Sequence, residues 1–299
     1  MTIKYYYIAL ILSTLLFSCE EEQTTLIAEG AELSLVADGF LFTEGPAADT
    51  NGDVFFTDQP NNRILKWSEA DNTISTYMEP AGRANGLYFD HDGNLLAAAD
   101  ENFELWRIDP EKKVTALFDA FQGKKLNGPN DIWVDPKGGI YFTDPYYQRP
   151  YWSRSEKEMK REGVYYIAPN QLEVKMVVTD FVRPNGLIGT PDGKTLYITD
   201  AGDDKTYVFA IAKNGSLEAR KIFVNMRSDG MTLDERGNVY LTGDGVSVFN
   251  KNGEQLLHIA VPEKWTANLT FGGADRSTLF ITASKGVYTL KMNVSGANK

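Results

Sequence analysis

The chain has 299 residues, of which 42% are hydrophobic and 12% aromatic, and its formal net charge is −11. This hydrophobic content is ordinary for a globular protein, and the aromatic share suits strands better than helices. Because the phosphates of nucleic acid require a basic protein face, the acidic balance argues against a nucleic-acid-binding role.

The N-terminus carries a candidate export signal. An apolar run over residues 5–17 follows Lys4 and ends just before Cys19, the single cysteine. The run is too short to span a membrane but matches the hydrophobic region of a signal peptide. Residues 16–19, Leu-Phe-Ser-Cys, resemble a bacterial lipobox, in which the cysteine carries lipid; a buried free thiol is the alternative, which the acidic residues 20–22 disfavour.

We therefore expect a lipoprotein signal peptide over residues 1–18 and a tether over residues 19–31. The protein would be exported and held on the periplasmic face or the cell surface, contacting the membrane only through a lipidated Cys19. Residues 32–37 then alternate with period two and predict a strand.

The rest of the chain repeats one pattern six times. Each copy opens on a polar residue, which we call the starter, and continues as an apolar strand, a tight turn and further strands. The intervals between starters run from 39 to 55 residues, a period typical of propeller blades. The six starters are Glu44, Asn85, Asn130, Asn185, Asp229 and Asn268.

This pattern predicts an all-β protein, a six-bladed β-propeller over residues 32–291, with a C-terminal tail over residues 292–299. Propellers commonly close by pairing a strand from one terminus with the blade built from the other, which removes exposed edges. We expect the strand at residues 32–37 to join the last blade beside residues 286–290, and the protein to be a monomer.

Equivalent positions of a radial repeat lie on a ring, so the six starters are expected to converge at one mouth of the central channel. Their oxygens suit calcium, magnesium or manganese better than softer metals. Opposed carboxylates at Glu44 and Asp229 would repel each other unless a cation lay between them. For Asn85 and Asn268, hydrogen bonding to nearby backbone at a strand end is the competing interpretation.

Histidine is nearly absent, which argues against a serine–histidine triad or a histidine-rich metal site. His91 falls in a predicted turn, and His258 falls in a strand-like run where we expect it to be packed. The longest interval contains residues 145–154, with four aromatic residues and two arginines. We expect this segment to form a lid or wall over the ring, the alternative being packing against a neighbouring loop.

Six motifs together resemble the SMP-30/gluconolactonase/LRE family, and in particular its bacterial gluconolactonase branch. The resemblance implies a six-bladed propeller lactonase that needs a divalent cation, here calcium, with magnesium, manganese or zinc as alternatives. The motifs are FTEGP at 42–46, NGPND at 127–131, FTDPYY at 142–147, RPNGL at 183–187, SDGM at 228–231 and DGVSVFN at 244–250.

The resemblance also implies roles for particular residues. Glu44, Asn185 and Asp229 would bind the metal, Asp229 would also accept and donate a proton, and Asn130 would contact substrate or metal. Mammalian-type members carry an arginine where this chain has Gly128. Arg149 or Arg154 in the long loop could replace that arginine as a substrate contact, and Asn85 is a further candidate.

The expected activity is hydrolysis of a sugar lactone. Because a carboxylate on a dication is a poor base, Asp229 would either bind with one oxygen and act with the other, or only orient the attacking water. One alternative is a non-catalytic surface propeller that binds a glycan or protein. Another is a propeller enzyme for phosphotriesters or aryl esters, which is expected to carry histidine near its metal.

Overall fold

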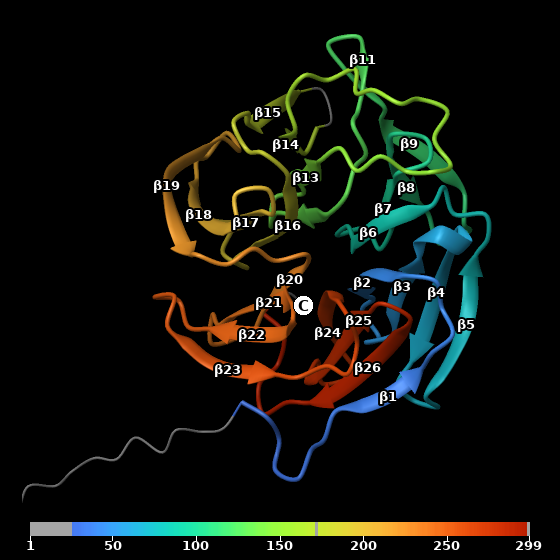
Figure 1. Ribbon diagram of the computed structural model, residues 1–299, viewed down its shortest axis with the longest axis vertical. Coiled ribbons are helices and arrows are strands. Elements are labelled where there is room, and N and C mark those ends of the chain that lie inside the picture. The colour runs from blue at the N-terminus through green and yellow to red at the C-terminus, as the bar shows by residue number, and fades with distance from the viewer. Residues whose placement is uncertain (1–25, 171–172, 298–299) are drawn as a thin grey trace, which may run out of the picture.

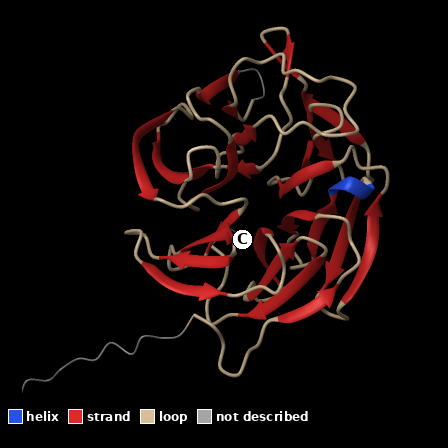
Figure 2. Ribbon diagram, viewed as in Figure 1, coloured by secondary structure: helices blue, strands red, loops and turns tan. Residues whose placement is uncertain are grey.

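The computed structural model describes residues 26–170 and 173–297. Six four-stranded antiparallel sheets stand radially around a central axis (Figure 1), as the sequence predicts for a six-bladed propeller. Apart from one short 3-10 helix, η1 (Gln59–Asn61), the regular structure of these ranges is strand (Figure 2). The signal peptide, Cys19 and the first part of the tether lie outside the described residues.

The strands of a blade follow one another along the chain, with the first strand nearest the axis. Blade one contains β2 (Thr43–Ala48), β3 (Val54–Asp58), β4 (Arg63–Ser68) and β5 (Thr73–Met78); blade two contains β6 (Ala84–Phe89), β7 (Leu95–Ala99), β8 (Glu104–Ile108) and β9 (Val114–Phe118). Blade three contains β12 (Ile132–Val134), β13 (Ile140–Asp144), β14 (Gly163–Ile167) and β15 (Val174–Val178); blade four contains β16 (Pro184–Gly189), β17 (Thr195–Asp200), β18 (Lys205–Ile211) and β19 (Leu217–Val224). Blade five contains β20 (Met231–Leu233), β21 (Val239–Gly243), β22 (Gly245–Phe249) and β23 (Gln255–Ile259); blade six contains β24 (Thr266–Gly272), β25 (Thr278–Ala283) and β26 (Gly286–Lys291). A small ribbon, β10 (Ala120–Phe121) with β11 (Lys124–Lys125), precedes blade three.

The N-terminal strand closes the ring. Strand β1 (Ser34–Ala37) pairs antiparallel with β26, with Ser34 opposite Thr289, and so forms the outermost strand of blade six. This confirms the predicted closure. Leu33, just before the strand, packs against the apolar cluster of blade six that includes Leu290.

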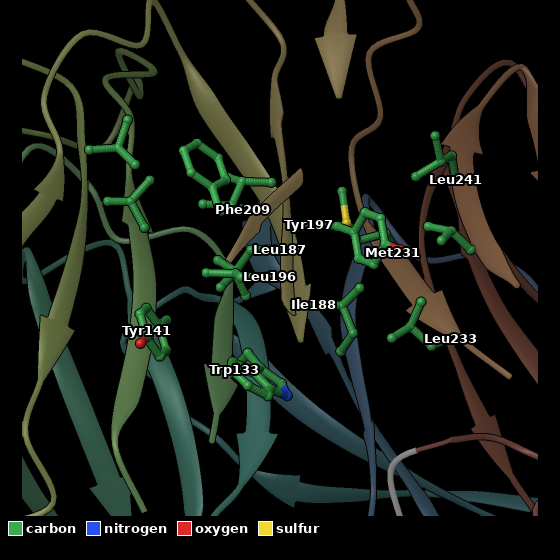
Figure 3. Close-up of a cluster of buried hydrophobic side chains, with 14 of the residues drawn as sticks. Trp133, Tyr141, Leu187, Ile188, Leu196, Tyr197, Phe209, Met231, Leu233 and Leu241 are labelled. Carbon is green, nitrogen blue, oxygen red and sulfur yellow. The ribbon is translucent and has the colours of Figure 1, made fainter. Parts of the chain in front are cut away.

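Apolar side chains fill the spaces between neighbouring blades. The largest cluster joins blades three, four and five (Figure 3), where Trp133 lies beside Tyr141, with ring centroids 5.6 Å apart. A Cβ on Gly189 would lie 2.2 Å from the Trp133 ring, so the indole occupies the space that a side chain there would need. Packing of this kind fixes the blades relative to one another and therefore fixes the positions of the starters.

In three blades the second strand ends in a threonine–aspartate pair whose carboxylate pins the segment leading into the starter. Each aspartate accepts hydrogen bonds from two consecutive backbone N–H groups, which gives this repeated motif a structural role. The acceptors and their donors are Asp58 with Leu41 and Phe42, Asp144 with Asn127 and Gly128, and Asp200 with Val182 and Arg183.

Neither histidine takes part in the channel. His91 makes a 2.8 Å hydrogen bond through Nε2 with the backbone oxygen of Asp135. His258 is exposed on the outer strand β23, so the expectation that it is packed is wrong, because only one face of an outermost strand is covered. Within the described ranges, no helix has the length and apolar character needed to cross a membrane.

The joint between blades one and six depends on Phe280, which is fully buried and packs against Phe56 and Trp67 with centroid distances of 5.4 and 5.2 Å. We predict that Phe280→Ala lowers the free energy of unfolding by about 3–5 kcal/mol, the range for truncating a buried aromatic side chain. Denaturant unfolding measures this. The control Leu256→Ala, at a residue 48% exposed, should change it by less than about 0.5 kcal/mol, and equal losses in both variants would contradict the packing described here.

Candidate active site

Five of the six starters line one cavity of about 310 Å³ at the end of the channel where the innermost strands begin. We call it the hub cavity. The prediction that all six starters converge is wrong for Asn268, which is not among the lining residues. Its Oδ1 instead accepts a 2.8 Å hydrogen bond from the N–H of Leu269, so it satisfies backbone at its own strand end. The lining residues are Phe42, Glu44, Gln59, Asn85, Asn130, Tyr147, Arg149, Arg183, Asn185, Ala201, Arg227, Ser228, Asp229 and Trp265.

The glycine that follows a starter allows the backbone of the neighbouring blade to pack directly against the innermost strand. A Cβ on Gly86 would lie 2.4 Å from the backbone oxygen of Asn130, and a Cβ on Gly186 would lie 2.3 Å from that of Asp229. Any larger residue at either position would push the blades apart. The starter–glycine pairs in the sequence therefore mark the places where successive innermost strands touch.

The starters also fall where the ladder is irregular. The pairing between first and second strands shifts register just after Glu44 in blade one, and in blades two and four the shift spans Asn85 and Asn185. A bulge bends its strand and changes the direction of the side chain it carries. This local irregularity frees the starter from the regular alternation of the sheet and is consistent with its facing the cavity.

Glu44 and Asp229 are the two carboxylates of the hub cavity. Burial, followed by the charge of Asp229, raises the pKa of Glu44 well above its usual range. Burial raises the pKa of Asp229 to about 6, while hydrogen bonds from Trp265 and Asn185 act in the opposite direction. Glu44 is buried and Asp229 is partly buried, and a cation bound between them would relieve the repulsion of the two carboxylates.

Trp265 fixes the orientation of Asp229. Its indole Nε1 donates a 2.5 Å hydrogen bond to Oδ2 of Asp229. The sequence analysis did not identify Trp265, because it lies in the loop before β24 and belongs to no repeated motif. The one feature of the sequence that could have pointed to Trp265 is its position three residues before the starter Asn268.

Asn185 links the ring to the long loop. Its Nδ2 donates a 3.1 Å hydrogen bond to the hydroxyl oxygen of Tyr147, and this leaves the amide oxygen free to act as an acceptor or ligand. Burial, together with the charge of Asp229, raises the pKa of Tyr147 to about 12, so the phenol stays protonated near neutral pH. Tyr147 was not predicted as an individual site residue, although it belongs to the quoted FTDPYY motif.

Residues 145–154 form part of the wall of the cavity, as expected for the long loop, through Tyr147 and Arg149. The segment is anchored on Asp100, whose Oδ2 accepts from Arg149 Nε at 3.0 Å and from the Tyr151 hydroxyl at 2.6 Å. The indole of Trp152 donates to the backbone oxygen of Asp100. Asp100 thus holds the loop rather than pinning its own blade.

Arg149 and Arg154, the two candidates for the substrate contact, have different surroundings. Arg149 lines the hub cavity, whereas Arg154 does not and lies with its guanidinium 3.5 Å from the centroid of the Phe103 ring. Of the two candidates, Arg149 is therefore the one that the structure brings to the hub cavity. At Gly128 a Cβ would lie 2.8 Å from Oδ1 of Asp100 and 3.0 Å from the Trp152 ring, so an arginine has no room there.

Some residues of the NGPND motif have structural roles and another lines the cavity. Asn127 is fully buried and donates through Nδ2 to the backbone oxygens of Asp144 and Arg161. Asn130 presents its side chain to the cavity, while its backbone bonds to Thr143 and Gly86. Asp131 lies behind the ring, where it accepts from the N–H groups of Ile132 and Leu187, and burial raises its pKa to about 7.

Among the described residues, no group of three His, Cys, Asp or Glu side chains is placed to hold a metal ion. A metal in the hub cavity would therefore be held by the two carboxylates together with amide oxygens. Glu44, Asn185 and Asp229, which the family resemblance names as ligands, do line the same cavity. This all-oxygen set suits a hard divalent cation.

The fold and this site define a six-bladed propeller with an oxygen-rich cavity on its axis. The chain belongs to the SMP-30/gluconolactonase/LRE family, whose profile, described as the SMP-30/Gluconolactonase/LRE-like region, matches residues 42–285. The resemblance identified from the sequence motifs is thereby confirmed.

Individual relatives support the same placement. A gluconolactonase from Zymomonas mobilis is 29% identical over 295 residues, covering 88% of this chain and 82% of its own length. The structure of a gluconolactonase from Xanthomonas campestris superposes with a TM-score of 0.83 at 28% identity, covering 89% of this chain and 91% of the other. A calcium-binding protein, regucalcin, from Agrobacterium tumefaciens has the same fold, with a TM-score of 0.75 at 18% identity over 90% of this chain and 96% of its own.

We predict that Glu44→Gln stabilises the chelator-treated protein at pH 8, because it removes a buried charge that Asp229 repels. A gain of ~1 kcal/mol corresponds to a rise in Tm of about 2–4 °C. The same variant should lose most of the stabilisation that calcium gives the unmodified protein, about 2.7 kcal/mol at a hundredfold excess over Kd. Thermal unfolding with and without calcium measures both effects.

Glu111→Gln is the matched control, since it neutralises an exposed glutamate far along the chain from any starter. It should leave the Tm of the chelated protein and its response to calcium unchanged. A chelated Glu44→Gln protein that melts well below the unmodified protein would contradict the charge repulsion described here.

Proposed function

We propose that the protein is a divalent-cation-dependent lactonase that hydrolyses a sugar lactone in the hub cavity. The observation that carries the proposal is the gathering of Glu44, Asn185 and Asp229 on a single axial cavity. Membership of a family that includes gluconolactonases supports lactone hydrolysis as the reaction.

The cation would be held by Glu44, Asn185 and Asp229, with calcium the expected ion because its coordination tolerates loose oxygen geometry. When bound, it would supply Lewis acidity toward the carbonyl oxygen of the lactone. The repulsion between Glu44 and Asp229, which line the same cavity, supports a cation bound between the two carboxylates.

Asp229 would move the proton. Oriented by the hydrogen bond from Trp265, its carboxylate would take a proton from the water that attacks the carbonyl carbon. The bond between that carbon and the ring oxygen then breaks, and the same proton passes to the ring oxygen, giving a hydroxy acid. Asp229 would bind the cation with one carboxylate oxygen and act on the proton with the other, or would only orient the attacking water.

Asn130 and the loop residues would bind and orient the substrate. The Asn130 amide lines the cavity with Asn85 and can donate a hydrogen bond to the carbonyl oxygen as negative charge develops there. Tyr147 and Arg149 form the wall beside Asn185. Such a wall would help to exclude bulk water from the reacting carbonyl.

The test uses the full-length protein, stripped of metal and then supplied with calcium, magnesium, manganese or zinc. Acid release from glucono-, galactono- and simple γ-lactones is measured for each ion. We expect hydrolysis of at least one sugar lactone that chelation abolishes and the preferred ion restores. No hydrolysis across the whole panel would overturn the proposal in favour of a non-catalytic propeller that binds a glycan or protein.

The role of Asp229 has its own test. Asp229→Asn should lower kcat by about 10²–10⁴-fold, the usual contribution of general acid–base catalysis. Calcium binding, followed by calorimetry, shows whether the ion is still held. Asp92→Asn, in an exposed turn, is the control and should leave kcat unchanged. Near-normal turnover of Asp229→Asn with the ion bound would rule out proton transfer by Asp229.

A further inference from the structure

We propose that the substrate of the hub cavity is a lactone that carries a second acidic group, a carboxylate or a phosphate, at the end remote from its carbonyl. This inference rests on the proposed lactonase function but adds the substrate class. Its basis is an arginine rim on the cavity, which consists of Arg149, Arg183 and Arg227.

The composition of the rim is selective. Within the described part of the chain, the three positively charged side chains that line the cavity are all arginines. A guanidinium offers a planar fork of donors that matches a carboxylate or phosphate, while an ammonium acts as a point charge. A surface that gained positive charge merely for solubility would not be expected to use arginine alone at this one place.

Aromatic rings hold the rim in position. The guanidinium groups of Arg183 and Arg149 lie 5.1 and 5.5 Å from the centroid of the same Tyr147 ring. The guanidinium of Arg227 lies 5.6 Å from that of Trp265. Tyr147 also accepts a hydrogen bond from Asn185, and Trp265 donates one to Asp229. The same two aromatic side chains therefore contact both the rim and the proposed metal ligands.

The arginines are only partly neutralised by the protein. Arg149 gives its Nε to Asp100, and Arg227 forms a 3.5 Å ion pair with the exposed Asp204. Arg183 forms no ion pair with any carboxylate in the described part of the chain, and it is exposed at the cavity. Arg183 is therefore the arginine of the rim whose positive charge is left for a bound anionic group.

A dication bound between Glu44 and Asp229 would offset the charge of these two carboxylates. A neutral sugar lactone would then leave the guanidinium of Arg183 without an anionic partner, whereas an acidic group would form charge-assisted hydrogen bonds with the rim. The cavity volume of about 310 Å³ is enough for a single small sugar acid. In this arrangement the reacting carbonyl would lie beside Glu44, Asp229 and the neighbouring amides, and the acidic group would lie at the arginine rim.

The experiment compares lactones that share a ring and differ in charge. Glucono-lactone is the neutral member, glucaro-lactone adds a carboxylate and 6-phosphogluconolactone adds a phosphate. For the full-length calcium-loaded protein, we expect kcat/KM to be about tenfold or more higher for at least one acidic lactone, the contribution of one charged hydrogen bond. Whichever acidic lactone has the higher value identifies the carboxylate or the phosphate as the group recognised.

Variants of the rim then test which arginines distinguish acidic from neutral lactones. Arg183→Gln and Arg227→Gln should each reduce the ratio of kcat/KM for acidic over neutral lactone, and the double variant should bring it close to one. Arg236→Gln, which removes one exposed positive charge in a turn away from the cavity, is the control and should keep the ratio of the unmodified protein. The ratio should also fall as salt concentration rises, because exposed charges are screened.

A binding measurement separates this proposal from the proposed activity. The calcium-loaded protein is titrated calorimetrically with gluconate, glucarate and 6-phosphogluconate, none of which requires turnover. Tighter binding of a doubly acidic ligand, lost in the double variant, supports the arginine rim even if no lactone is hydrolysed. Equal affinities for the three ligands, or equal kcat/KM for neutral and acidic lactones, would overturn the inference while leaving lactonase activity intact.

Discussion

The close approach of successive innermost strands at the hub is the constraint on which the rest of this structure depends. At Gly86 and Gly186 the backbone of one blade meets the starter of the next with no space for a Cβ. Because the strands pack so tightly, five starters from five blades share one small cavity. A looser hub would leave the same side chains separated and solvated, and their chemistry would be that of surface residues.

This crowding has an electrostatic consequence. Glu44 and Asp229 are brought onto one cavity, and burial raises the pKa of each. The aspartates that end the second strands differ from this pair, because they accept hydrogen bonds from backbone N–H groups. Carboxylates therefore serve two purposes in this protein, and their hydrogen-bond partners distinguish the structural ones from those of the cavity.

Several residues that shape the hub cavity lie outside the repeated pattern. Trp265 orients Asp229, and the loop over residues 145–154 brings Tyr147 and Arg149 to the cavity wall. The loop is held by Asp100, whose carboxylate accepts hydrogen bonds from Arg149 and Tyr151. The ring of starters supplies a common chemical floor, and these non-repeated residues give the cavity its walls, its charge distribution and so its selectivity.

The sequence by itself determined the blade number, the closure by residues 32–37, the family and the starter positions, because each is written in a periodic pattern or a contiguous motif. Only the tertiary structure decided that Asn268 bonds to its own strand, that Arg149 rather than Arg154 reaches the cavity, and that Trp265 contacts Asp229. The physical reason is that such contacts join segments far apart in the chain. Their geometry follows from how the blades pack, and no local spacing records it.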